Sequence, residues 1–195
     1  MRRLETECVG SCYAAGQTMT AELNDITGFR GEAIVELCLT DYRNFAKPLF
    51  RPGFLGDKWP TIDFYVELCN VAGSVPYFFA QAKATGRALT KKSHALRISA
   101  KKRDIERLLR LPGPTYIFGI HEPSQRVFVR SVHRGTPVKA MTQIPLTHEL
   151  TSGNLAVLHN EVRVFWQTHD HKPQFSVFAS RKAIHRADLL GEEAS

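Results

Sequence analysis

The sequence lacks the features of membrane, exported and disulfide-rich proteins. No apolar run among the 195 residues approaches the roughly 18 needed to cross a bilayer. The first 20 residues carry Glu5 and Glu7 and no continuous apolar block, unlike a secretory signal. Its 4 cysteines include no Cys-x-x-Cys pair, and no histidine follows them at zinc-finger spacing. These absences predict a cytoplasmic protein in a reducing compartment, without a structural zinc site.

What the sequence does contain is typical of one folded domain. Hydrophobic residues make up 43% and charged residues 23%, values close to the average for globular proteins. Residues 1–22 lack periodicity and predict a flexible lead-in, residues 23–190 a single domain, and residues 191–195 a tail. Apolar spacing predicts helices at 26–43, at 100–111 with Ser99 as N-cap, and from 151 or 152. Strands are expected at 45–50, 61–68, 76–85, 95–98, 115–120, 126–132 and 175–178, with 51–60 as a loop and a hairpin joining 61–68 to 76–85. This order predicts a mixed α/β fold.

One segment carries the whole basic character of the chain. Between residues 83 and 110, ten basic minus two acidic residues leave +8, so with a total of +7 the rest of the chain sums to about −1. A localised cationic stretch is what a polyphosphate partner requires, although a solvated helix face is an alternative interpretation. The candidate contacts to a nucleic-acid backbone are Lys91, Lys92, Arg97, Lys101 and Lys102.

Three polar residues interrupt the two central strands of the expected sheet. Asp63 stands near the start of one strand, and Gln81 and Lys83 share one face of the next. Desolvating a lysine or a carboxylate costs several kcal/mol unless each group is paired. The sequence therefore predicts that these three side chains lie together at a sheet edge, where a divalent ion and water satisfy them.

These residues, in this order, resemble the PD-(D/E)XK nuclease superfamily, the restriction-endonuclease-like fold. The resemblance rests on Gly31-Glu32 in the first helix, Trp59-Pro60-Thr61-Ile62-Asp63, and Gln81-Ala82-Lys83. From residue 31 to about 166, roughly 70% of the chain, the sequence is similar to a bacterial family of this superfamily, the domain of unknown function DUF4365. The resemblance implies a mixed β-sheet core flanked by helices, with a nuclease domain over 23–190.

The resemblance also implies an activity and the residues that would perform it. It assigns Glu32, Asp63, Gln81 and Lys83 as catalytic residues, the first three as ligands of Mg²⁺ or Mn²⁺. Gln81 stands where the superfamily usually has glutamate, and its amide oxygen can still bind a hard cation, although one negative charge is lost. Lys83 would position the attacking water or act as a base. Glu36, one turn after Glu32, is an alternative helix ligand.

The expected function is hydrolysis of DNA phosphodiester bonds, in restriction, antiviral defence or DNA processing. RNA remains open as a substrate, as do a homodimer and an activating partner protein. The alternative is a non-catalytic nucleic-acid-binding or assembly module with a degenerate site. Each site residue also has a structural interpretation: Asp63 as a strand-start hydrogen-bond acceptor, Gln81 as a satisfied buried amide, and Lys83 as a lysine extending from an edge strand. Trp59 and Tyr65 could stack on a base or pack in the core.

Overall fold

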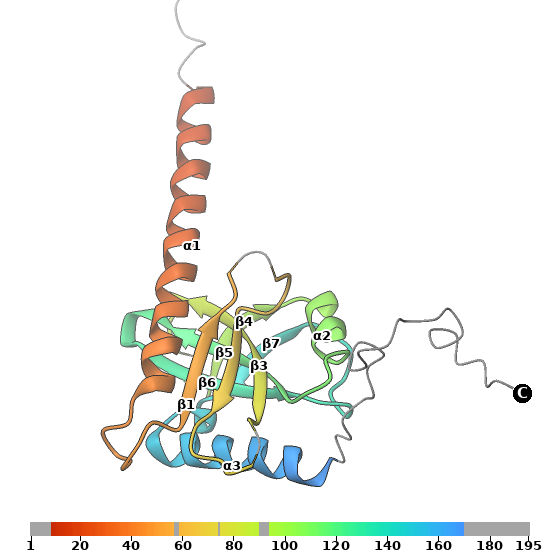
Figure 1. The fold of residues 1–195 in the computed structure, drawn as a ribbon. Helices are drawn as coiled ribbons and strands as arrows, with labels where there is room; N and C mark the ends of the chain where they lie inside the picture. Colours follow the sequence, from red (N-terminus) through yellow and green to blue (C-terminus); the bar gives the residue numbers. More distant parts are fainter. Residues whose placement is uncertain (1–8, 57–58, 74, 90–93, 170–195) are drawn as a thin grey trace, which may run out of the picture.

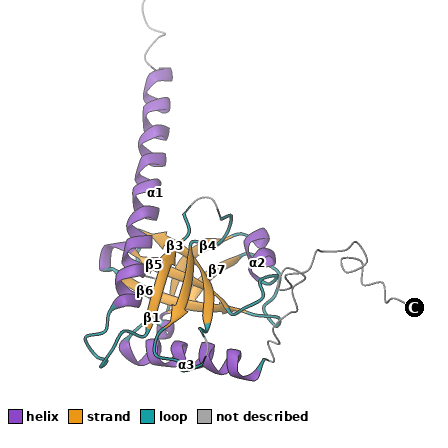
Figure 2. Ribbon diagram, in the orientation of Figure 1, coloured by secondary structure: helices purple, strands orange, loops and turns teal. Residues whose placement is uncertain are grey.

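The structure is a mixed α/β fold, as predicted. The computed structural model describes residues 9–56, 59–73, 75–89 and 94–169, with the backbone alone for residues 9–21. In this part of the chain, three α-helices accompany a five-stranded and a two-stranded sheet (Figure 1; Figure 2). A mixed sheet flanked by helices is therefore confirmed.

The five-stranded sheet has the order β1-β2-β3-β5-β6. Its strands are β1 (Phe50–Phe54), β2 (Phe64–Leu68), β3 (Tyr77–Thr85), β5 (Thr115–His121) and β6 (Arg126–Val132). Neighbouring strands are antiparallel except for the parallel pair of β3 and β5. The hairpin predicted between β2 and β3 is confirmed, and β3 lies at the centre of the sheet.

One face of this sheet packs against α1 (Val9–Thr40) and α3 (Ser152–Thr168). Alternate strand residues such as Phe64, Ala80 and Phe118 form a buried core with apolar residues of both helices. Helix α3 begins where the sequence predicts, because the Thr151 side chain accepts a hydrogen bond from the Asn154 backbone N–H at 3.3 Å. This face is closed by helices.

The opposite face packs against a second layer. The strands β4 (Ala95–Ala100) and β7 (Met141–Pro145) pair antiparallel, and with α2 (Lys102–Leu108) they enclose a second core around Ile117 of β5. Gly119 makes this packing possible, because a Cβ there would lie 2.8 Å from Leu96 Cδ2 and 2.9 Å from Ile144 Cδ1. The connections are short one-turn 3-10 helices, η1 (Glu122–Ser124) after β5 and η2 (Leu146–His148) after β7.

Helix α1 has 32 residues, about 48 Å at 1.5 Å per residue, and its N-terminal part projects away from the sheets (Figure 1). It meets the sheet at Gly31, where an added Cβ would lie 2.5 Å from the Cβ of Ala84 in β3. Arg30 Nε donates to Glu122 Oε1 at 2.6 Å and ties the helix to η1. A search of the described residues for a helix both long and apolar enough to span a membrane finds none.

Two element boundaries near the N-terminus differ from those predicted. The first helix begins at Val9 rather than at residue 26, so residues 9–22 are helical rather than an aperiodic lead-in. Gly10 and Gly16 lie within this helix, where each costs only about 1 kcal/mol relative to alanine. Strand β1 spans 50–54 and not 45–50, so most of it falls in the segment that was expected to be a loop.

Three further differences concern the middle of the chain. Strand β2 begins at Phe64 rather than at residue 61, because Asp63 leaves the regular ladder. Ser99 is not a helix cap: β4 continues to Ala100, and Lys101 precedes the first residue of α2. Strand β7 was not predicted at all. The strand expected at 175–178 and the tail at 191–195 lie outside the described residues.

Candidate functional site

The candidate site lies where the ladder between β2 and β3 ends. Regular pairing stops at Phe64 and Ala80. Beyond it, the Asp63 backbone N–H donates to the Ala80 carbonyl at 2.9 Å, and the Ala82 N–H donates to Asp63 Oδ2 at 2.6 Å. The carboxylate thus replaces a backbone acceptor at the point where the two strands separate. This places Asp63 directly beside Gln81.

Side-chain alternation sets the direction of the polar groups. Gly31 of α1 packs on Ala84, and Ala80 and Ala82 belong to the same helix-covered face. Because successive residues of a strand point to opposite faces, Gln81 and Lys83 point to the other face. Asp63 precedes β2, and its carboxylate lies at the Ala82 N–H, at the end of the ladder next to Gln81. The structure thus brings Gln81 and Lys83 to one face of β3, with the Asp63 carboxylate at the end of the same ladder.

Gln81 is the buried polar residue of this group. Its relative exposure is 3%, and its neighbour across the parallel pair is Ile117 of the second core. The side-chain Oε1 is buried and accepts no hydrogen bond from any group in the described part of the chain. A buried acceptor without a partner costs about 1–3 kcal/mol. The interpretation of Gln81 as a fully satisfied buried amide therefore does not account for Oε1.

Lys83 is half-buried, two residues further along the same face. It pairs in register with Gly119 of β5, which has no side chain to cover it. Among the described residues, Lys83 forms no ion pair. The backbone thus places Lys83 one alternate position along β3 from Gln81, on the same face.

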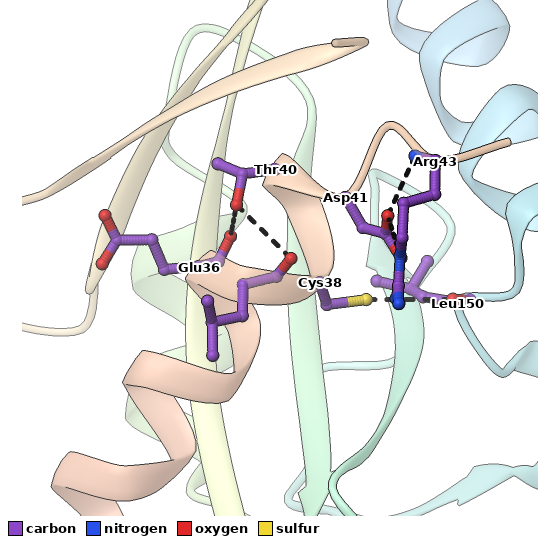
Figure 3. A network of polar contacts seen from close by, with 7 residues as sticks. Glu36, Cys38, Thr40, Asp41, Arg43 and Leu150 are labelled. Atoms are coloured by element: carbon purple, nitrogen blue, oxygen red, sulfur yellow. Dashed lines mark hydrogen bonds and ion pairs between the residues drawn. The ribbon is translucent and has the colours of Figure 1, made fainter. Parts of the chain in front are cut away.

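Glu32 reaches the same end of β3 from the other layer. It follows Gly31, which contacts the residue after Lys83, and its side chain is half-buried. Glu36 is exposed, and its backbone carbonyl accepts from Thr40 Oγ1 at 2.8 Å. Figure 3 shows the Glu36 carboxylate pointing away from the polar contacts at the end of α1. Burial therefore favours Glu32 over Glu36 as the helix residue nearest β3, although α1 covers the face opposite Gln81.

The predicted backbone contacts are only partly described. Arg97 of β4, Lys101 and Lys102 are exposed, and Lys102 Nζ lies 3.7 Å from Glu106 Oε1. Lys91 and Lys92 lie outside the described residues. The sequence also gave no reason to single out Arg107 of α2, whose Nη1 lies 3.5 Å from Thr61 Oγ1, two residues before Asp63. A cation of the basic segment therefore lies near the start of β2, a contact that no sequence spacing indicates.

The cavity at the start of β5 is separate from these groups. It has a volume of about 780 Å³ and is lined in part by Tyr116 and Glu161. The Tyr116 hydroxyl donates to Glu161 Oε1 at 2.7 Å. Burial, and then the neighbouring Glu161 charge, raise the pKa of Tyr116 far above its ordinary value. None of the four predicted catalytic residues lines this cavity.

Metal-ligand side chains are sparse in the described ranges. No three His, Cys, Asp or Glu residues there form a cluster able to hold a metal ion. A site made of Asp63 and the Gln81 amide is not of that type, because Asp63 is its single residue of those four kinds. No protein-family model matches the sequence, and comparisons with curated proteins and with solved structures found no significant match. The function must therefore be argued from the site itself.

Proposed function

We propose that this chain is a nuclease that uses a divalent metal ion to hydrolyse DNA phosphodiester bonds. The observation that carries the proposal is the buried Gln81 Oε1, which has no hydrogen-bond partner in the described chain, on a strand face that it shares with Lys83 and at the ladder end that Asp63 joins. An acceptor, an anion and a cation at the end of a β-ladder match what phosphodiester hydrolysis requires. The resemblance to the PD-(D/E)XK superfamily supports the same assignment.

The donor set suits Mg²⁺ or Mn²⁺. Both ions prefer hard oxygen ligands, and the Asp63 carboxylate and the Gln81 amide oxygen are of that kind. Glu32 lies on α1, which covers the opposite face of the sheet, so it would add negative charge from across β3 and not as a ligand beside Gln81. A bound ion of this type stabilises the negative charge that develops on the phosphate and acidifies a water ligand. Because Gln81 is neutral, we expect binding weaker than at a site with glutamate there.

Lys83 would act directly on the reacting groups. Its ammonium can hold the attacking water by hydrogen bonding and offset anionic charge that develops in the transition state. The Ala82 N–H donates to Asp63 Oδ2 at 2.6 Å and orients the carboxylate. The exposed cations Arg97, Lys101 and Lys102 would contact the DNA backbone without reading sequence. Restriction or defence against foreign DNA in the cytoplasm is the cellular role that the resemblance supports.

A second candidate is a nucleic-acid-binding module without catalysis. It is favoured by the neutral side chain at Gln81 and by the hydrogen bond that Asp63 Oδ2 already accepts within the strand pair. Both features lower the negative charge and the number of lone pairs that the site offers to a cation. The two candidates make the same prediction for binding and opposite predictions for cleavage.

A cleavage assay separates them. Purified full chain is incubated with supercoiled plasmid, linear duplex, single-stranded DNA and RNA, in Mg²⁺, Mn²⁺ or EDTA. We expect nicking or cutting that requires the metal and falls at least 100-fold in Lys83→Ala and Asp63→Asn, since each removes a group that acts in the transition state. Lys47→Ala, which removes an exposed lysine from the α1–β1 connection, is the matched control and keeps full activity.

The possible results of the cleavage assay distinguish the two candidate functions. Circular dichroism must show that each variant is folded as the parent protein is. Metal-dependent cleavage that Lys83→Ala does not reduce would assign the activity to a contaminant or another site. Binding with no cleavage in any metal, equal for parent protein and Lys83→Ala, would establish the non-catalytic module instead.

A further inference from the structure

A row of aromatic side chains lies on the same strands as the candidate site. Tyr77 and Phe79 of β3 have ring centroids 5.5 Å apart, and Tyr65 of β2 lies 5.2 Å from Tyr77 and 6.0 Å from Phe79. Trp166 of α3 extends the row, with its ring 4.4 Å from Tyr77 and its indole N–H donating to the Tyr77 carbonyl at 2.7 Å. These four rings, Tyr65, Tyr77, Phe79 and Trp166, are called the aromatic row below.

The aromatic row leads along β3 to the polar residues. Tyr77 and Phe79 have the same parity as Gln81 and Lys83, so all four point to one face of the strand. Tyr65 pairs with Phe79 and has the parity of Asp63. Because alternate strand residues are about 6.6 Å apart, the rings end one alternate position before Gln81. The aromatic row and the candidate site therefore form one continuous strip.

Burial distinguishes the three strand rings of the row from those of the core, whereas Trp166 packs against the helix-covered core. Phe64, Phe78 and Phe118 are fully buried and pack edge-to-face or within the helix-covered core. Tyr65, Tyr77 and Phe79 are partly exposed and belong to neither buried core of the described chain. Packing in the two cores therefore does not explain why three adjacent aromatic residues occupy these partly exposed strand positions.

Charged side chains lie at both ends of the aromatic row. Arg51 of β1 pairs in register with Glu67 of β2, with Arg51 Nη1 3.6 Å from Glu67 Oε2, and 78% of its side chain is exposed. Lys83 lies at the other end of the row. The Glu67 carboxylate already pairs with Arg51, whereas Lys83 forms no ion pair in the described chain, so a phosphate at the Lys83 end with its bases on the rings fits this face.

We propose that the aromatic row stacks the bases of a single-stranded nucleic acid and directs the strand along β3 to Asp63, Gln81 and Lys83. This deepens the proposed function by naming the substrate class: a single strand, or a duplex end with unpaired bases. Bases within a duplex already stack on one another and cannot lie against a sheet face. Stacking on aromatic side chains accepts any base, so binding is insensitive to sequence.

A binding experiment tests the proposal without any need for cleavage. The full chain is titrated in EDTA with fluorescein-labelled oligothymidylate, with an abasic oligonucleotide of equal length, and with a duplex. We expect oligothymidylate to bind at least tenfold more tightly than the abasic strand, which has the same phosphates and no bases. Tyr65→Ala and Phe79→Ala lose about tenfold for oligothymidylate each and leave the abasic strand unchanged.

Matched variants keep the test interpretable. Tyr65→Phe retains the ring and should bind as the parent does, whereas Phe79→Leu retains apolar volume without a ring and should lose affinity even though it folds. Tyr42→Ala removes an aromatic side chain that is 56% exposed and lies away from β2 and β3, and it should have no effect. Equal binding of oligothymidylate and the abasic strand, or equal loss for both in the variants, overturns the proposal.

The result separates this proposal from the nuclease assignment. Base-dependent binding in a protein that cleaves nothing would retain the aromatic row and remove the catalytic function. Cleavage of closed duplex with no base-dependent binding would retain the nuclease and remove the aromatic row. Tryptophan fluorescence of a Trp59→Phe variant gives an independent readout, because quenching by oligothymidylate then reports on Trp166 alone.

Discussion

At the scale of single residues, the side chain of Gln81 opposes folding unless it has a partner. Its Oε1 is buried without a hydrogen bond in the described chain, at a cost of about 1–3 kcal/mol. Gln81→Leu removes that cost at similar volume. We expect the free energy of unfolding without metal to rise by about 1 kcal/mol, and Mn²⁺ binding to be lost, as measured by urea denaturation and titration calorimetry. A variant that is destabilised by a similar amount would mean that the amide is satisfied.

The charge at the same position sets the strength of metal binding. Gln81→Glu adds the carboxylate that the PD-(D/E)XK pattern usually contains. Since an anion attracts a divalent cation more strongly than a neutral amide, we expect at least tenfold tighter Mn²⁺ binding. The same substitution should lower the free energy of unfolding in EDTA, because the new charge is then buried without compensation. Unchanged Mn²⁺ affinity would show that no cation binds beside residue 81.

Cys38 is a residue whose environment makes it unreactive. Burial, and then the charges of Asp41 and Glu149, raise the pKa of its thiol to about 11. Its Sγ donates to the Leu150 carbonyl at 3.8 Å (Figure 3). Two pKa units above the ordinary value of 9.0 reduce the thiolate fraction at pH 8 about 100-fold.

Alkylation measures this effect. In a variant with Cys8, Cys12 and Cys69 changed to serine, iodoacetamide at pH 8 should modify native protein at least 100-fold more slowly than protein in urea. In the native protein, the limited access of iodoacetamide to Cys38 and the raised pKa of its thiol both slow alkylation. Rates that agree within threefold would show that α1 does not pack closely on the sheet.

At the scale of elements, the contact of α1 with β3 depends on a single missing side chain. A Cβ at Gly31 would lie 2.5 Å from the Cβ of Ala84, closer than two carbon atoms can approach. Gly31→Ala should therefore lower the free energy of unfolding by about 1–3 kcal/mol, as expected for overpacking. Denaturant unfolding with the Ala84→Gly double variant, which restores space, should recover part of that loss.

Gly28 is the matched control on the same helix. A Cβ there meets nothing within 4 Å, so Gly28→Ala should raise the free energy of unfolding by up to about 1 kcal/mol through helix propensity alone. Equal effects of the two substitutions would mean that the close approach of α1 and β3 is absent in solution.

The elements that could be predicted from the sequence are those whose own apolar pattern determines their secondary structure. Strands β3, β5 and β6 are rich in β-branched and aromatic residues, and they lie within one residue of the predicted bounds. Strand β1 contains Pro52 and Gly53, which predict a turn, yet an edge strand tolerates proline because one side of its backbone needs no partner. Strand β7 has exposed Thr142 and Gln143 and is defined by its pairing with β4, which no local pattern indicates.

The candidate site was predictable to the same extent. Period-two alternation places Gln81 and Lys83 on one face, and it does so correctly from sequence alone. Two features of the site depend on how separate elements pack, so only the structure reveals them. They are the Gln81 Oε1, which has no hydrogen-bond partner in the described chain, and the contact of Arg107 with Thr61. The aromatic row likewise needs the register between Tyr65 and Phe79, which fixes the two strands relative to each other.

At the scale of the whole molecule, the net charge of +7 is concentrated in residues 83–110. Of the described cations there, Arg97 is on β4, Lys101 precedes α2 and Lys102 opens it, all in the layer that covers the site-bearing face of the sheet. Arg97 lies between Leu96 and Ile98, which pack into the second core, so its side chain is on the outer side of this layer, while α1 and α3 cover the other face of the sheet. Each phosphate contact releases counterions and makes affinity depend on salt.

This arrangement predicts which charges control the salt dependence of DNA binding. The variant with Arg97, Lys101 and Lys102 all changed to glutamate should reduce the slope of log affinity against log salt by up to about 3, because B-DNA contributes about 0.9 per phosphate contact. The control changes Arg43, Lys47 and Arg163 to glutamate; these belong to the α1–β1 connection and α3, and the net charge falls equally. Fluorescence anisotropy between 50 and 300 mM salt measures both slopes. If the control lowers the slope as much as the test variant does, total charge governs binding and the layer of β4 and α2 is not the DNA-binding face.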